Sequence, residues 1–169
     1  STKLYADDIK YLDIRSAEEF GATIEAYSSP EEFDACDGTA ELADGVNIGQ
    51  QNRKGFGFCY RSTIGNDTEY NNYGYKLHII YGLTASPSER SYSTVNDSPE
   101  AATLSWEVSS TPVNVAGFKP TSIVTINSKK INPEALKEIE DALYGTESVE
   151  PKILLPDEIK AICDKHIGG

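Results

Sequence analysis

The sequence predicts a mainly β protein of the α+β class, with one amphipathic helix lying across a sheet. Polar residues alternate with aromatic and β-branched residues at several places along the chain, which indicates half-buried strands. Helical spacing with capping signals is clear in one segment, at about residues 132–144. Apolar residues make up 38% of the 169 residues, enough for the core of a globular domain. We therefore expect a single domain over residues 1–169.

Segments in which polar and apolar residues alternate are predicted to form strands. They are predicted at residues 10–14, 22–27, 56–60, 73–81, 102–108 and 121–126. Segment 112–115 is expected at a sheet edge or a strand start, because Pro112 has no N–H to donate to a central ladder. The strands at 56–60 and 73–81 should form a hairpin with a long, polar, exposed tip at residues 62–72.

The predicted helix has recognisable residues at both ends. Asn132 suits the N-cap position, and Pro133 suits the first turn. Gly145 follows the last turn, where a residue in the left-handed region is favoured. Apolar side chains at helical spacing share one face: Leu136, Ile139 and Leu143.

Three further segments carry weaker signals. Residues 28–32 have the serine, proline and acidic residues of a short helix start. Residues 34–55 are rich in Asp, Gly, Gln and Asn and are predicted to form a long loop. The tail at 151–159 is predicted as a short strand leading into a weak helical turn.

The chain is strongly acidic. Its 27 acidic and 15 basic residues give a formal net charge of −12. This charge argues against a protein that grips nucleic acid, because phosphate binding needs a basic surface. The sequence also has no apolar run near the roughly 20 residues that span a membrane, and its first residues lack the features of a signal peptide. We expect neither membrane insertion nor export.

No motif predicts catalysis. The GxSxG, Walker and HExxH motifs are absent, and Gly55-Phe56-Gly57 lacks the third glycine of a dinucleotide site. An acidic segment lacks the ligand spacing of a calcium loop and is interpreted as solvated: Asp34, Asp37, Glu41 and Asp44. We expect no catalytic, cofactor-binding or metal-binding residue, no cofactor and no enzymatic activity.

The cysteines and histidines are interpreted as structural or surface residues. Cys36, Cys59 and Cys163 are odd in number and widely spaced, so we expect reduced thiols. His78 lies in a predicted strand without an evident nucleophile or metal partner, and His166 is expected to be exposed. Several of the ten tyrosines lie around the hairpin, where they could be interface anchors or ordinary cross-strand partners.

Part of the sequence resembles the major tail tube proteins of long-tailed phages that infect Gram-positive bacteria. The resemblance covers a little over half of the chain, while residues 1–55 match less well. It is carried by these segments: Phe58–Ser62, Tyr75–Gly82, Ala85–Arg90, Tyr92–Glu100, Leu104–Val113, Lys119–Thr121, Thr125–Ser128 and Leu136–Gly145.

The resemblance implies a β-sandwich, or barrel-like tail tube fold, with one flanking helix. It implies self-association into rings, typically hexameric, that stack into a tube through which DNA is ejected. An acidic lumen would repel the DNA backbone, so the DNA would pass without specific binding. The implied partners are further copies of the chain and other tail proteins, such as the tape measure and the tail terminator. The implied location is the virion tail, after synthesis in the cytoplasm of the host bacterium.

Two other functions fit the residues. A head decoration or capsid-associated protein would also be acidic and β-rich. A carbohydrate- or receptor-binding β-sandwich module could use the clustered tyrosines and Trp106. Trp106 alternates with Leu104 and Val108, however, which favours a side chain in the core.

Overall fold

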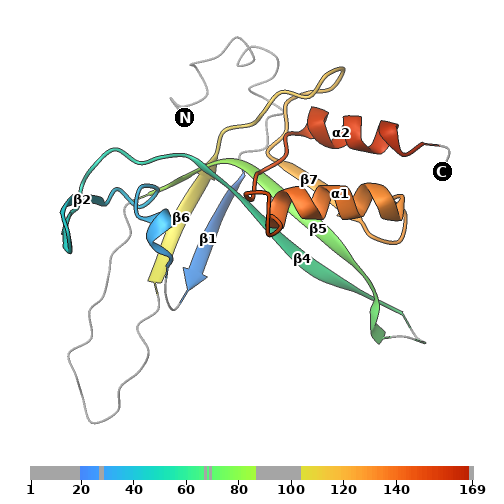
Figure 1. The fold of residues 1–169 in the computed structure, drawn as a ribbon, viewed down its shortest axis with the longest axis horizontal. Coiled ribbons are helices and arrows are strands. Elements are labelled where there is room, and N and C mark those ends of the chain that lie inside the picture. The colour runs from blue at the N-terminus through green and yellow to red at the C-terminus, as the bar shows by residue number, and fades with distance from the viewer. Residues whose placement is uncertain (1–19, 27–28, 67, 69, 87–103, 168–169) are drawn as a thin grey trace. The chain divides into compact units, whose positions relative to one another are not determined.

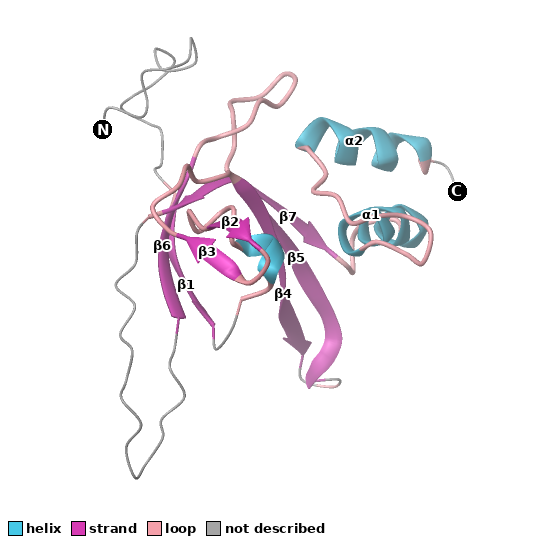
Figure 2. Ribbon diagram, turned by 60° about the vertical axis from the view of Figure 1, so that its left-hand side comes forward, coloured by secondary structure: helices cyan, strands magenta, loops and turns pink. Residues whose placement is uncertain are grey.

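The computed structural model describes residues 20–26, 29–66, 68, 70–86 and 104–167. In these residues the protein is mainly β, with antiparallel sheets and two α-helices, which confirms the predicted fold class (Figure 2). The predicted strand at 10–14 lies outside the described residues. The chain divides into two compact units, one of residues 1–55 with 84–110 and one of 56–83 with 111–169, where the sequence predicts a single domain.

The first unit contains two antiparallel strand pairs. β1 (Gly21–Ala26) pairs with β6 (Leu104–Ser110), and both agree with predicted strands. β2 (Ala40–Ala43), labelled in Figure 1, pairs with β3 (Val46–Ile48) in a separate small hairpin (Figure 2). A short 3₁₀ helix, η3 (Glu31–Phe33), precedes them.

The β2–β3 hairpin lies inside the segment that the sequence predicts as a long loop, residues 34–55. Its turn contains Gly45, whose φ of +74° is favourable for glycine and lets the chain reverse within two residues. The short helix predicted at 28–32 is present only as the 3₁₀ turn, and Ser28 lies outside the described residues.

Trp106 is the central buried side chain of the first unit. It is 2% exposed, and its ring meets that of Phe33 edge to face at 5.0 Å between centroids. Its indole Nε1 donates to Asp37 Oδ1 at 2.8 Å, and Arg53 Nη1 lies 3.6 Å from the same oxygen. The predicted core position of Trp106 is therefore confirmed, and this ring is not available to line an exposed sugar site.

The second unit is built on a long antiparallel hairpin. β4 (Phe56–Asn66) and β7 (Ile123–Asn127) both pair with β5 (Tyr70–Ala85), whose last two residues belong to the first unit. Ahead of β7, Val113 and Thr121 form an isolated bridge, in keeping with the predicted edge position of 112–115.

The hairpin has a much shorter tip than predicted. The strands continue through most of the segment 62–72, so that residues 67–69 alone join β4 to β5. Thr63 pairs with Tyr75 and Ile64 with Gly74, because β-branched and aromatic residues there favour extended pairing over a loop. The long polar tip was therefore a wrong prediction.

The predicted amphipathic helix is confirmed as α1 (Pro133–Tyr144). Asn132 caps it, since its side-chain oxygen accepts from the backbone N–H groups of Glu134, at 2.8 Å, and Ala135, at 3.3 Å. Gly145 follows with the expected positive φ, +77°, although its ψ of 169° is extended.

A second helix was not predicted. Residues 151–155 form no strand, and α2 (Pro156–Lys165) runs for 10 residues where the sequence indicates a weak turn. Its N-cap residue, Leu155, makes no side-chain capping bond, so local signals are poor. Burial of Ile159 against the core supplies the stabilisation that the sequence pattern does not display.

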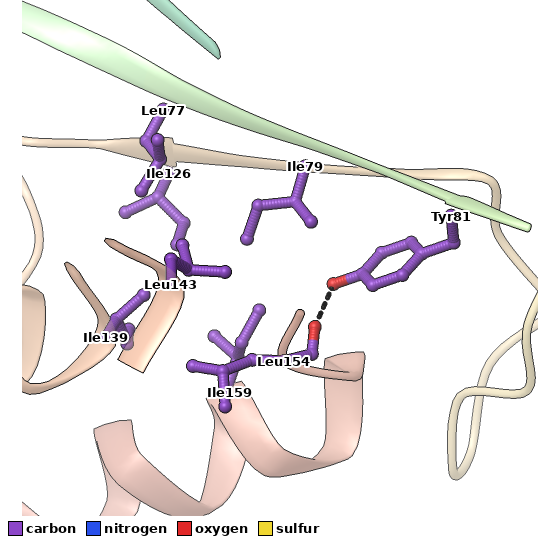
Figure 3. Close-up of a cluster of buried hydrophobic side chains, with 8 residues drawn as sticks. All are labelled: Leu77, Ile79, Tyr81, Ile126, Ile139, Leu143, Leu154 and Ile159. Atoms are coloured by element: carbon purple, nitrogen blue, oxygen red, sulfur yellow. Dashed lines mark hydrogen bonds between the residues drawn. The ribbon is translucent and has the colours of Figure 1, made fainter. Parts of the chain in front are cut away.

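The core of the second unit lies between one face of the sheet and both helices (Figure 3). Apolar side chains come from every element and form one cluster: Leu77, Ile79, Tyr81, Ile126, Ile139, Leu143, Leu154 and Ile159. The Tyr81 hydroxyl donates to the Leu154 carbonyl oxygen at 2.7 Å. Burial raises the pKa of Tyr81, which keeps the hydroxyl protonated as a donor.

Replacing Tyr81 with phenylalanine should lower the free energy of unfolding by about 1–2 kcal/mol, because the Leu154 carbonyl loses a buried donor. Urea unfolding of the full chain measures the change. Tyr60→Phe is the matched control, since Tyr60 is exposed and the same substitution there should cost little. Equal effects at the two positions would contradict this assignment.

Candidate interaction surface on the β4–β5–β7 sheet

The two faces of the β4–β5–β7 sheet carry different side chains. Successive strand residues point to opposite faces, so Leu77 and Ile79 face the helices while His78 and Ile80 face away from them. We call the face away from the helices the outer face. Strand register orders it into three cross-strand rows: Phe58–Ile80–Ile123, Tyr60–His78–Thr125 and Ser62–Lys76–Asn127.

The outer face is partly apolar and partly exposed. Phe58 is 39% exposed, Tyr60 41% and Ile123 38%. The rings of Phe58 and Tyr60 lie 6.0 Å apart, and Tyr60 stacks on His78 at 4.7 Å. Exposed aromatic side chains that neighbour one another suit contact with another protein.

His78 contacts a hydroxyl at each ring nitrogen. Ser62 Oγ lies 2.7 Å from Nε2, and Thr125 Oγ1 lies 3.2 Å from Nδ1. A serine hydroxyl beside a histidine ring is the arrangement of a nucleophile and its general base. In a catalytic triad the second ring nitrogen contacts a carboxylate, whereas here it contacts the hydroxyl of Thr125. The arrangement fits best as a hydrogen-bonded link across β4, β5 and β7.

These partners of His78 were missed in the sequence. Thr125 lies directly opposite His78, and Ser62 is diagonal to it on β4. The signal that could have found them is the exact register of three strands, which the alternation of residues alone does not determine.

A polar network connects α1 to the inner face of the hairpin. Arg61 Nη2 lies 2.9 Å from Glu140 Oε1, and its guanidinium stacks over the ring of Tyr75 at 4.4 Å. The Tyr75 hydroxyl donates to the same Glu140 oxygen. Burial, followed by this hydrogen bond and the Glu140 charge, raises the pKa of Tyr75 to about 12. The network links the hairpin to α1, and its side chains lie on the face of the sheet opposite the outer face.

The sheet of the second unit has two outer strands. Within the described residues, β4 and β7 each form a ladder with β5 and with no other strand. An outer strand presents unpaired backbone N–H and C=O groups that can pair with another chain. The outer face therefore lies between two potential strand-pairing edges.

The sequence leaves two roles open for the tyrosines, interface anchors or ordinary cross-strand partners, and the tyrosines in the described residues differ in burial and contacts. Tyr81 is a core residue and Tyr75 belongs to the network with Glu140, so both are structural. Tyr60 is exposed on the outer face, where an interface anchor would lie.

In the part of the chain that the structure describes, the acidic segment and the cysteines do not form a metal-binding site. No group of three or more His, Cys, Asp or Glu side chains there could hold a metal ion. Asp37 is engaged by Trp106, and Glu41 accepts from the backbone N–H of Gly45. The three cysteines are free thiols, with Cys36 buried.

His166 is not exposed as predicted. Its side chain is 17% exposed and lies against α1, where it contacts Glu138 and Glu134. The prediction was wrong because it took proximity to the chain end as a sign of exposure, whereas α2 places this residue against another helix.

Comparison of the chain with protein-family models, curated proteins and solved structures finds no match. Among the described residues, no helix combines the length and apolar character needed to cross a membrane.

Proposed function

We propose that this chain is a structural virion protein, not an enzyme, that self-assembles into stacked rings forming a phage tail tube for DNA ejection. The observation that carries the proposal is the outer face, a partly exposed sheet surface with neighbouring aromatic side chains, on strands β4 and β7 that, within the described residues, each form a ladder with β5 alone. Ring closure pairs the outer edges of such strands and removes them from solvent. The resemblance of residues 58–62 and of the stretch 73–145 to tail tube proteins supports the same function.

The negative net charge of the chain supports the proposed role as a conduit for DNA. A net charge of −12 on every subunit gives an assembled wall a high density of negative charge. Such a wall repels phosphates, so DNA would slide without specific contacts. In this proposal the rings are hexameric, the other partners are tail proteins such as the tape measure and the terminator, and the location is the virion tail.

Electron microscopy and sedimentation of the concentrated 169-residue chain test the proposal. We expect rings or stacked tubes. A protein that stays monomeric at every concentration would contradict self-assembly. A head decoration protein would instead bind capsids and form no tubes.

Charged substitutions test the role of the outer face. The double variant Phe58→Lys with Ile123→Lys should weaken assembly at least about tenfold, because it places desolvated charges in the contact. Phe118→Lys is the control, since Phe118 is 76% exposed and lies outside the strands. Circular dichroism confirms that each variant is folded. Unchanged assembly of the double variant would rule out the outer face while leaving self-assembly itself in place.

A further inference from the structure

The chain contains two Asp-Gly pairs, Asp37-Gly38 and Asp44-Gly45, which lie in opposite environments. In such a pair the glycine nitrogen can attack the aspartate side chain, because glycine has no Cβ to obstruct the approach. The attack leads to a succinimide and then to isoaspartate, without any enzyme. The local structure of each pair decides whether this reaction occurs.

Asp44-Gly45 forms the exposed turn between β2 and β3. Both residues are exposed, and no atom lies within 4 Å of a Cβ built on Gly45. The surrounding hairpin is also exposed, from Glu41 to Ile48. A small hairpin with so little burial is held weakly, so its turn can deform locally. The turn therefore has the space and the freedom that closure of a ring requires.

A carboxylate lies beside the nitrogen that would attack. Glu41 Oε1 accepts from the backbone N–H of Gly45 at 3.3 Å. An amide nitrogen is a weak nucleophile while it keeps its proton, and a hydrogen-bonded carboxylate is placed to remove that proton. The hairpin thus brings a base and a nucleophile next to the side chain of Asp44.

Asp37-Gly38 is restrained where Asp44-Gly45 is open. The Asp37 side chain is 7% exposed, accepts from Trp106 Nε1 at 2.8 Å and lies 3.6 Å from Arg53 Nη1. A Cβ built on Gly38 would lie 3.0 Å from the Gln51 carbonyl oxygen, so this backbone is crowded. Attack on Asp37 would require its carboxylate to leave these partners, and the fold should suppress it.

We propose that Asp44 is a self-modification site, at which the hairpin converts aspartate to isoaspartate with Glu41 as the general base. Glu41 takes the proton from the Gly45 nitrogen, which attacks Cγ of the protonated Asp44 carboxyl. The new N–Cγ bond closes a succinimide ring, the bond from Cγ to the hydroxyl breaks, and water leaves with the proton held by Glu41. A second water then adds to the main-chain carbonyl carbon of Asp44 and breaks its bond to the nitrogen.

The product changes the connection between the strands. Its main chain runs through Cβ and Cγ of Asp44, so the turn is longer by one carbon. Ala43 pairs with Val46 across this turn, and the added carbon alters the spacing on which that pairing depends. The reaction also releases an α-carboxylate at the turn, the group on which isoaspartyl carboxyl methyltransferases act. This modification does not require the assembly proposed above.

Ageing of the 169-residue chain at mildly acidic pH tests the proposal. Mass spectrometry with electron-transfer fragmentation distinguishes the two isomers, and a succinimide appears as a peptide lighter by one water. Isoaspartate should form at least about tenfold faster at Asp44 than at Asp37, because Asp37 must first lose a charge-assisted hydrogen bond. In urea, where the fold is lost, the two rates should be similar. Equal rates in the folded chain would overturn the proposal.

Substitutions test the chemistry at the turn. Glu41→Gln keeps an acceptor for the Gly45 N–H but removes the base, and should slow the reaction at Asp44 about tenfold. Glu32→Gln is the matched control, because it removes an exposed negative charge from η3, outside the hairpin, and should leave the rate unchanged. In Asp44→Glu the product at this position should disappear, because the ring would need one more atom. An unchanged rate in Glu41→Gln, or equal slowing by Glu32→Gln, would contradict the role of Glu41.

Discussion

Replacing Gly82 with alanine should destabilise the second unit by about 3 kcal/mol or more. Gly82 has a φ of +60° within β5, a region where a Cβ atom is strained. A Cβ built there would lie 2.1 Å from the carbonyl oxygen of Thr111. Thr111 cannot easily retreat, because its N–H donates to the Gly82 carbonyl at 2.9 Å. Urea unfolding measures the loss, and a large decrease in soluble expression is the expected outcome if the variant fails to fold.

Gly117→Ala is the matched control for Gly82→Ala. Gly117 has a similar backbone conformation, with φ of +79°, but no atom lies within 4 Å of its built Cβ. Backbone strain alone should cost about 1 kcal/mol. The difference between the two variants measures the steric contact with Thr111. Equal losses would show that this contact is relieved at little cost.

Replacing Ile139 with alanine should lower the free energy of unfolding by about 2–5 kcal/mol. Ile139 is fully buried on α1 and belongs to the cluster with Leu77 and Leu143 (Figure 3). Truncation removes apolar contacts and leaves a cavity between the helix and the sheet. The change is read from the shift in the urea midpoint.

Ile139→Val provides the graded control. It removes one methylene from the same place and should cost about 0.5–1.5 kcal/mol. Alanine and valine variants of equal stability would show that the site collapses around the missing atoms. That result would contradict the tight packing of α1 on the sheet.

The outer face was predictable in its pattern but not in its role. Alternation in the sequence already placed Phe58 and Tyr60 on one side of a strand. Which side the helices cover depends on contacts between segments far apart in the chain, such as Ile139 with Leu77. The partners of His78 depend in the same way on the register of β4 and β7 against β5.

By itself the sequence determined the features that depend on neighbouring residues. The extent of α1 follows from its Asn132 cap and its apolar spacing, since capping and amphipathic periodicity act within a few turns. The strand character of β5 and the core position of Trp106 follow from alternation, and the strong acidity follows from composition.

Tertiary structure alone decided the features that depend on distant partners. α2 lacks a side-chain cap and forms where Ile159 can be buried under the sheet. β4 and β5 extend almost to the tip because each supplies the other with backbone partners along its length. His166, near the chain end, is enclosed because α2 returns along α1 and brings it to Glu138. In each case the stabilising contact joins residues far apart in sequence, which local patterns do not record.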